Sequence, residues 1–174
     1  MCHDVELAYK TIKQYETEWH INPKQIFLCG FSAGGHLAAI AGSRLGKRKI
    51  KGVILGYPVM GAEYIRALDG KVRSALVRHR IVHLFRHSPL KEASRRTPPT
   101  FIWHTRRDVL VSPRGSLRYV EKLLQEKVPC ELHLYQIGQH ALSTATPDSA
   151  RFKFQIQPHI ATWVELVYPW IQYN

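Results

Sequence analysis

The feature that most constrains how this chain can fold is the run of residues 26–36, IFLCGFSAGGH. An apolar stretch leads there into the pattern G-x-S-x-G, and the next residues, HLAAIA, have the small apolar face of a helix packed on a sheet. This context predicts a buried parallel strand at residues 25–29, a sharp turn at Ser32 and a helix after it. We expect that a side chain at either flanking glycine, Gly30 or Gly34, would clash in so tight a bend.

A serine on such a turn presents its hydroxyl above the sheet, in the position of a nucleophile. The hydroxyl becomes reactive when a histidine takes its proton and an acid orients that histidine. In hydrolases with this turn, the acid and then the histidine follow the serine along the chain. Here Asp108 follows an apolar run at residues 100–105, and His140 follows an alternating run at residues 130–137. Because the carboxyl ends of parallel strands share one edge of a sheet, we expect all three side chains at the same rim.

Competing assignments exist for both the acid and the base. Asp108 could cap the next helix, but the Ser-Pro pair at residues 112–113 suits the first positions of that helix better. Among the other histidines, His104 and His133 lie inside predicted strands and not at strand ends. His36 follows the turn on the helix, so we expect it to pack beneath the turn. These considerations favour Asp108 and His140.

Three stretches of the chain together resemble the α/β-hydrolase superfamily: GFSAGGHLAA at residues 30–39, TPPTFIWHTRRDVLV at 97–111 and VPCELHLYQIGQHALS at 128–143. Within it, the chain is similar to the acetyl esterase and carboxylesterase group, related to hormone-sensitive lipase and to esterases of the xylan and feruloyl type. The resemblance implies a serine esterase that cleaves small carboxylic esters, with Ser32 as nucleophile, Asp108 as acid and His140 as base. It also implies that the backbone N–H of Ala33 stabilises the oxyanion, and that no metal or organic cofactor is required.

The resembled fold has eight strands, whereas this chain has four strand patterns, at residues 25–29, 52–57, 100–105 and 130–137. We therefore expect a partial α/β-hydrolase fold of about four parallel strands flanked by helices, which corresponds to the C-terminal half of the family fold. The N-terminal strands and the glycine-rich segment of the oxyanion hole are then missing. The nucleophile strand would become a sheet edge, which predicts self-association or a partner chain.

Two other functions fit the same sequence. The chain could be an inactive hydrolase remnant that acts as a binding or scaffold protein, because the first half of the family fold is missing. It could also be a serine peptidase of the prolyl-oligopeptidase type, which shares the order of the three residues. That group usually has a bulky aromatic residue after the serine, where this chain has Ala33. The survival of Ser32, Asp108 and His140 in the expected order argues against a remnant, so the esterase interpretation is favoured.

Length and charge bound the remaining possibilities. The 174 residues predict a single domain, residues 1–174, with a lid-like insert at about residues 61–99. The formal net charge is +12, and residues 71–96 are rich in lysine and arginine. A solvated positive face accounts for this charge. No helix-turn-helix, RNP or zinc-finger pattern indicates specific binding of nucleic acid.

Two side-chain clusters bear on the site. His79, His83 and His87 are spaced four residues apart, but no carboxylate or cysteine completes a metal site near them in the sequence. We therefore expect no metal there. Arg106 and Arg107 directly precede the predicted acid, and these cations could pair with it in competition with the histidine.

The cysteines and the hydropathy indicate a compartment. Cys2, Cys29 and Cys130 form an odd set without metal-ligand spacing, which predicts reduced thiols. No apolar stretch is long enough to span a bilayer, and the first residues form an amphipathic pattern unlike that of a signal peptide. The sequence therefore predicts a cytoplasmic protein whose partner is a small-molecule ester.

Overall fold

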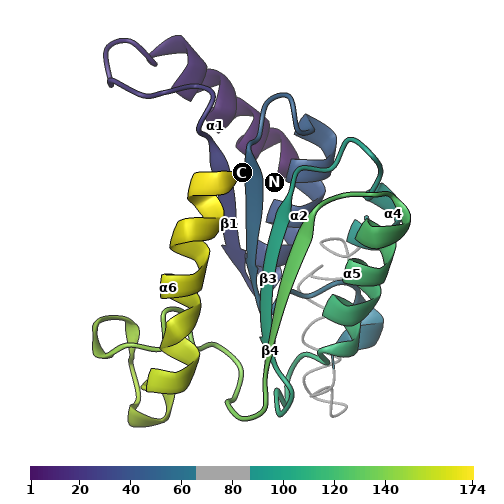
Figure 1. Cartoon of the computed structure of the whole chain (residues 1–174), viewed down its shortest axis with the longest axis vertical. Helices are drawn as coiled ribbons and strands as arrows, with labels where there is room; N and C mark the ends of the chain where they lie inside the picture. Colours follow the sequence, from purple (N-terminus) through teal and green to yellow (C-terminus); the bar gives the residue numbers. More distant parts are fainter. Residues whose placement is uncertain (66–86) are drawn as a thin grey trace.

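The computed structural model describes residues 1–65 and 87–174, and its centre is one parallel sheet (Figure 1). The sheet has the order β1-β2-β3-β4, and neighbouring strands are parallel throughout. Its strands are β1 (Phe27–Phe31), β2 (Gly52–Gly56), β3 (Thr100–Thr105) and β4 (Cys130–Tyr135). The predicted partial α/β-hydrolase fold, with about four parallel strands flanked by helices, is confirmed.

Helices cover both faces of this sheet. α6 packs on one face, whereas α1, α2 and α5 lie on the other (Figure 1). The longer helices are α1 (Cys2–Gln14), α2 (Ala33–Leu45), α5 (Arg114–Gln125) and α6 (Pro158–Tyr173). The short elements are α4 (Pro89–Glu92) and the 3-10 turns η1 (Ala62–Tyr64), η3 (Pro147–Ser149) and η4 (Lys153–Gln155).

The first strand lies two residues further along the chain than the predicted range 25–29. β1 pairs Phe27 with Gly52 and Phe31 with Gly56, so the strand continues through Gly30 to the residue before the turn. The apolar run located the strand, but pairing with β2 decides where it starts and stops. The turn after β1 therefore follows the strand with no intervening loop.

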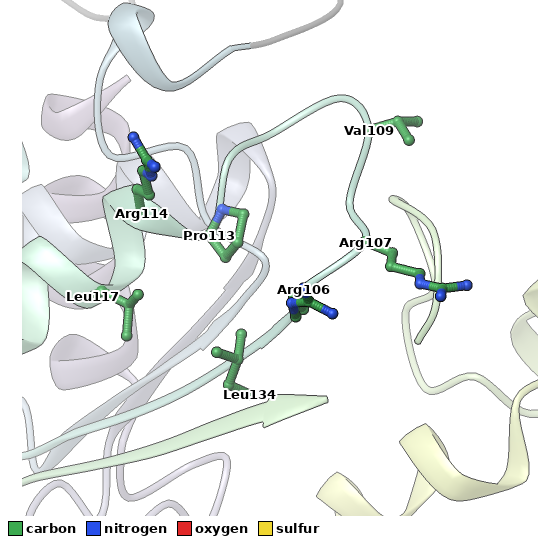
Figure 2. Close-up of a pocket in the computed structure, with 7 residues that line it drawn as sticks. All are labelled: Arg106, Arg107, Val109, Pro113, Arg114, Leu117 and Leu134. Carbon is green, nitrogen blue, oxygen red and sulfur yellow. The ribbon is translucent and has the colours of Figure 1, made fainter. Parts of the chain in front are cut away.

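The segments that follow the strands gather at the carboxyl end of the sheet. Ser32 connects β1 to α2, and the loop of residues 106–113 connects β3 to α5 (Figure 2). Residues 136–157 lead from β4 to α6. The lid-like insert predicted at about residues 61–99 falls after β2, and its middle, with His79 and His83 and most of the basic run at 71–96, lies outside the described residues.

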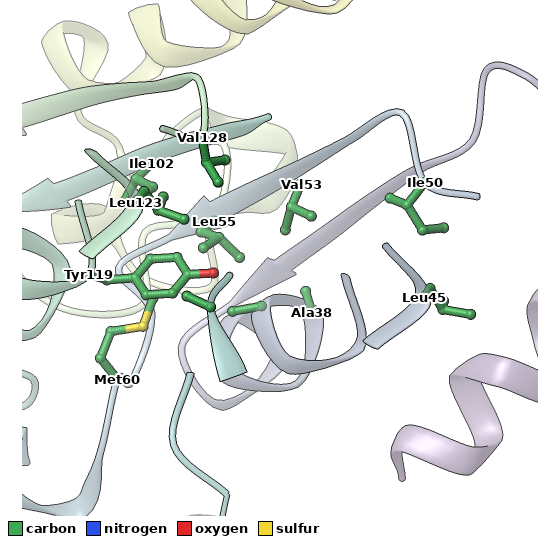
Figure 3. Close-up of a cluster of buried hydrophobic side chains, with 12 residues drawn as sticks. Ala38, Leu45, Ile50, Val53, Leu55, Met60, Ile102, Tyr119, Leu123 and Val128 are labelled. Carbon is green, nitrogen blue, oxygen red and sulfur yellow. The ribbon is translucent and has the colours of Figure 1, made fainter. Parts of the chain in front are cut away.

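The core has two parts, one on each face of the sheet. Figure 3 shows the part beneath α2 and α5, where Leu55 of β2 and Ile102 of β3 meet Tyr119 of α5. The other part packs α6 on the sheet through Trp103, Trp163 and their buried neighbours. Every residue of β2 and β3 is buried, whereas β1 and β4 are half-exposed edges. The two interior strands thus form a rigid base for the rim.

Among the described residues, β1 pairs only with β2, and its other edge is unpaired. Cys29 on this strand is exposed. Such an edge offers backbone hydrogen-bonding groups to a further strand. No helix within residues 1–65 and 87–174 is long and apolar enough to cross a membrane.

Candidate active site

The turn between β1 and α2 holds Ser32 in a strained backbone conformation. Its φ and ψ are 54° and −118°, which is unusual for a residue other than glycine. Backbone hydrogen bonds stabilise this conformation: the Ser32 N–H donates to the Gly56 carbonyl at 3.0 Å, and the Ser32 carbonyl accepts from the N–H groups of His36 and Val59 at 3.2 and 3.0 Å. The surrounding backbone therefore fixes the serine above the sheet, in the geometry of a nucleophile turn.

The glycines around Ser32 differ in why they are needed. A Cβ at Gly30 would lie 2.3 Å from the Gly34 carbonyl oxygen, which is backbone and cannot yield. At Gly34, in contrast, a Cβ would have no described atom within 4 Å. The expectation that both flanking glycines avoid a clash is therefore wrong for Gly34. The second close approach is at Gly35, where a Cβ would lie 2.7 Å from Cβ of Pro58.

The structure brings the three residues predicted for catalysis into one chain of hydrogen bonds. Ser32 Oγ lies 2.8 Å from His140 Nε2, and His140 Nδ1 lies 2.6 Å from Asp108 Oδ2. A carboxylate can only accept, so Nδ1 carries the proton and Nε2 is left to accept from the serine hydroxyl. The His140 side chain is 10% exposed and that of Asp108 is fully buried. This is the arrangement in which a histidine can act as a base toward serine.

Asp108 is held as a carboxylate from several sides. Its Oδ1 accepts hydrogen bonds from the backbone N–H groups of Leu110 at 2.9 Å and Val111 at 2.8 Å. Burial alone would raise the pKa of Asp108, but hydrogen bonds from His104, His140 and the Val111 amide outweigh it and hold the pKa well below its usual value. Asp108 therefore remains ionised beside His140 at neutral pH.

The two arginines before Asp108 were expected to compete with His140 for its carboxylate, but their side chains lie elsewhere. Among the described residues, the side chains that lie against the Asp108 carboxylate are those of His140 and His104, while Arg106 and Arg107 are exposed. Both arginines line a hollow of about 760 Å³ between the loop of residues 106–113, α5 and β4, with apolar Leu117 and Leu134 beside them (Figure 2). Because the carboxylate faces inward, the cations on its loop do not displace the histidine.

The loop that carries His140 is held by side chains from other elements. Three non-glycine residues in it have positive φ: Ala141 at 64°, Ser143 at 52° and Ala145 at 58°. The Ser143 N–H donates to the hydroxyl of Tyr57 at 3.0 Å, and the Ser143 carbonyl accepts from the indole N–H of Trp163 at 3.1 Å. The ring of Tyr57 also meets that of His140 edge to face, at 4.8 Å between centroids.

Two residues of this site were not identified from the sequence. Tyr57 directly follows β2 at the carboxyl rim, and that position was the available signal. His104 was set aside because it lies within a strand, but it is fully buried and its Nε2 lies 3.3 Å from Asp108 Oδ2. His36 is buried as predicted, and its Nδ1 lies 2.8 Å from the Val59 carbonyl, to which it donates.

The remaining predicted contributor is Ala33, the first residue of α2, which is exposed beside the serine. The first N–H groups of a helix have no partner within the helix, and they form the positive end of the helix dipole. No cluster of three or more histidine, cysteine or acidic side chains suited to a metal ion occurs in the described part of the chain. The rim thus presents a hydroxyl, an imidazole and a helix start to a ligand.

These features place a hydrogen-bonded serine, histidine and aspartate at the carboxyl rim of an α/β sheet. A profile of the family described as alpha/beta hydrolase fold matches residues 1–144, and the chain belongs to that family. Among curated proteins it is 27% identical over 158 residues to endo-1,4-beta-xylanase B of Butyrivibrio fibrisolvens, covering 83% of this chain and 25% of that protein. It is 25% identical over 173 residues to an acetylxylan esterase of Xylanibacter ruminicola, covering 94% of this chain and 35% of that protein.

Solved structures resemble the chain over almost its full length. A sugar hydrolase from Lactococcus lactis superimposes with a TM-score of 0.83 and 32% identity, covering 99% of this chain and 67% of that one. A carboxylesterase from Lactobacillus plantarum gives a TM-score of 0.80 and 26% identity, covering 95% of this chain and 64% of that one. The chain spans about a quarter to a third of the curated relatives and about two thirds of these structures. The predicted resemblance to the esterase group of α/β hydrolases is confirmed.

Proposed function

We propose that this protein hydrolyses small carboxylic esters, with Ser32 as nucleophile, His140 as general base and Asp108 as the acid that orients it. The observation that supports this most directly is the chain of hydrogen bonds from Ser32 Oγ through His140 to Asp108, with distances of 2.8 and 2.6 Å. Two of the similar proteins, an acetylxylan esterase and a carboxylesterase, bear the names of ester hydrolases.

In the proposed reaction, Ser32 Oγ attacks the ester carbonyl carbon while its proton passes to His140 Nε2. Asp108 stabilises the imidazolium that forms, and the Ala33 N–H at the start of α2 donates to the oxyanion. When the tetrahedral intermediate collapses, the bond to the alcohol breaks and His140 returns the proton to the leaving oxygen. Water then attacks the acyl group with His140 again as base, which releases the acid and restores Ser32. This sequence of steps requires neither metal nor organic cofactor.

The proposed substrates are esters with short acyl groups. The esterase-like motifs at residues 30–39 and 128–143 support this choice, as does the similarity to an acetylxylan esterase. We expect p-nitrophenyl acetate to be hydrolysed in preference to p-nitrophenyl palmitate. Faster turnover of the palmitate ester would contradict the proposed substrate class.

A fluorophosphonate probe tests the nucleophile without requiring fast turnover. We expect the probe to label the parent chain and the control variant Ser94→Ala, in which a serine far along the chain is removed, and not to label Ser32→Ala. Labelling of Ser32→Ala would reject the assignment of the nucleophile. A folded parent chain that neither reacts with the probe nor hydrolyses esters would instead favour the non-catalytic remnant.

We further propose a domain organisation, an association state and a location for this protein. Residues 1–174 form one domain to which the segment at about 61–99 adds a lid-like insert, and the unpaired edge of β1 favours self-association or a partner chain. The three cysteines of the structure are free thiols, which fits the cytoplasmic location predicted from the sequence. Analytical ultracentrifugation of the parent chain and of Cys29→Lys, which adds a charge to the β1 edge, tests the association. Equal monomeric behaviour of both would contradict it.

A further inference from the structure

We propose that His104 is a positioning residue for this reaction: its ring holds the carboxylate oxygen of Asp108 that also binds His140, and Ser116 fixes the orientation and tautomer of that ring. The inference rests on the proposed function, because it assigns His104 a role in the same Ser-His-Asp site. It adds a second histidine beside the acid, against the same carboxylate oxygen as His140.

His104 lies on β3, and its side chain is fully buried beneath α5. An imidazole in such a place needs hydrogen-bond partners for both ring nitrogens, because burying an unpaired polar group is costly. Nδ1 lies 2.8 Å from Ser116 Oγ on α5, and Nε2 lies 3.2 Å from the Val111 carbonyl and 3.3 Å from Asp108 Oδ2. The ring is therefore fixed between the helix and the loop that carries the acid.

These partners determine which nitrogen carries the proton. A carbonyl and a carboxylate can only accept, so Nε2 must be the N–H and shares its hydrogen between Val111 and Asp108. The Ser116 hydroxyl can rotate to donate to Nδ1. His104 thus serves as a fixed donor toward the acid, and its other nitrogen is occupied by the serine.

The two oxygens of Asp108 have different tasks. Oδ1 accepts from two backbone N–H groups of its own loop, which fixes one corner of the carboxylate. Oδ2 accepts from two histidines, at 2.6 Å from His140 and 3.3 Å from His104. Without His104 the carboxylate could rotate about the corner at Oδ1, and Oδ2 would leave the line to His140. His104 therefore keeps the acid in line with the base.

Among residues 1–65 and 87–174, the elements packed around this pair present the following charged and polar groups. Arg106 and Arg107 lie on the same loop with exposed side chains, and α5 contributes the neutral Ser116. The loop after β4 contributes His140 itself. A change at His104 should therefore reach the reaction through Asp108 and His140.

The variants His104→Leu, His104→Gln and Ser116→Ala test this role in the full chain. Leucine removes the donor to Asp108, glutamine retains an amide N–H at about the reach of Nε2, and Ser116→Ala removes the partner of Nδ1. His133→Leu is the matched control, because His133 is also a strand histidine paired with a carboxylate, Glu131 at 2.6 Å, but it lies on β4 outside the site. Rates of p-nitrophenyl acetate hydrolysis are normalised to the fraction of folded chain.

We expect His104→Leu to lower kcat by about 10- to 100-fold with KM within about 3-fold, since misplacing a reacting group by about 1 Å has effects of this order. The acidic limb of the pH profile of kcat/KM should move to lower pH, because a displaced Asp108 carboxylate stabilises protonated His140 less. His104→Gln should restore most of the rate and the parent profile, Ser116→Ala should fall between the two, and His133→Leu should match the parent. Equal losses in His104→Leu and His104→Gln, with an unmoved profile, would show a merely structural role and overturn the proposal.

Proton NMR separates this inference from the proposed function. The His140 Nδ1–H that donates to Asp108 should give a resonance at low field in the parent chain, as short hydrogen bonds to carboxylates do. We expect the resonance to move in His104→Leu and to keep its position in His104→Gln and His133→Leu. If the parent hydrolyses no ester, the proposed function fails, yet this measurement still decides whether His104 positions the acid. A resonance that is unchanged in His104→Leu overturns the inference even if the esterase is active.

Discussion

Ser32 and His140 lie 2.8 Å apart, but the loops that carry them are held in different ways. The serine turn is fixed by backbone groups, with hydrogen bonds to Gly56, His36 and Val59 and a close approach at Gly30. The histidine loop is fixed by side chains of other elements, above all by Asp108 and Tyr57. The nucleophile therefore depends on local backbone geometry, whereas the base depends on residues brought together from distant parts of the chain.

The serine turn should be most sensitive to a substitution at Gly30. A Cβ there would lie 2.3 Å from a backbone oxygen of α2, so Gly30→Ala must push α2 away from β1. We expect it to cost more than about 3 kcal/mol of unfolding free energy and to abolish labelling by the probe. Urea unfolding measures the first effect. The control is Gly34→Ala, which should stay within about 1 kcal/mol of the parent because its Cβ meets no described atom and alanine favours a helix.

In the histidine loop, a substitution at Asp108 should lower the catalytic rate more than it lowers the stability of the fold. Asp108→Asn removes the charge that stabilises protonated His140 and lets the ring take the wrong tautomer, so we expect kcat to fall by about 10⁴-fold. His140→Ala should lower it by a similar factor, because it removes the base itself. Asp148→Asn, on the exposed turn η3, is the control and should behave as the parent. Parent-like ester hydrolysis by Asp108→Asn would move the acid elsewhere, with Glu131 next to be tested.

Low pH should destabilise the fold through protonation of the Asp108 carboxylate. The pKa of Asp108 is lower in the folded chain than in the unfolded chain, so its ionised form stabilises the fold above pH about 4. This contribution is lost as the pH falls toward the folded pKa, since the unfolded chain then binds the proton first. We expect the free energy of unfolding to drop between pH about 5 and 2 in the parent, and to drop less steeply in Asp108→Asn. Identical slopes in the two chains would contradict this role of Asp108.

The smallest expected effect concerns the support of the histidine loop by Tyr57. Tyr57→Phe keeps the ring against His140 but leaves the Ser143 N–H without its acceptor. We expect a loss of about 1 kcal/mol in unfolding free energy and a fall of a few-fold in kcat. Tyr135→Phe provides the control, because its hydroxyl contacts Thr162 at 3.3 Å, away from the histidine loop. An unchanged kcat in Tyr57→Phe would show that Asp108 alone orients His140.

The sequence predicted the elements that depend on local pattern. Strand patterns located all four strands, although β1 begins and ends two residues later than predicted because its pairing with β2 sets its limits. Apolar residues at helical spacing continue as far as Trp19, before the Asn-Pro pair at residues 22–23, but α1 ends at Gln14 and Trp19 stacks on Tyr15 in the turn that follows. Pro169 falls within the apolar pattern of the last helix, where a proline usually ends or bends a helix, yet α6 continues through it, with Trp163 and Trp170 buried against the sheet. Burial against the sheet outweighs the hydrogen bond that this proline omits.

The amino-acid sequence by itself determined which residues could form the site, because a G-x-S-x-G turn between a strand and a helix and two polar residues after strands are local patterns in a fixed order. The tertiary structure decided how they are supported. Gly34 has room for a side chain, His104 lies against Asp108 four residues further along the chain, and Tyr57 lies against His140 from the end of β2. The contact of Tyr57 with His140 joins residues far apart in sequence, and that of His104 with Asp108 depends on how the loop after β3 folds back, so both distances follow only from the packing of the whole fold.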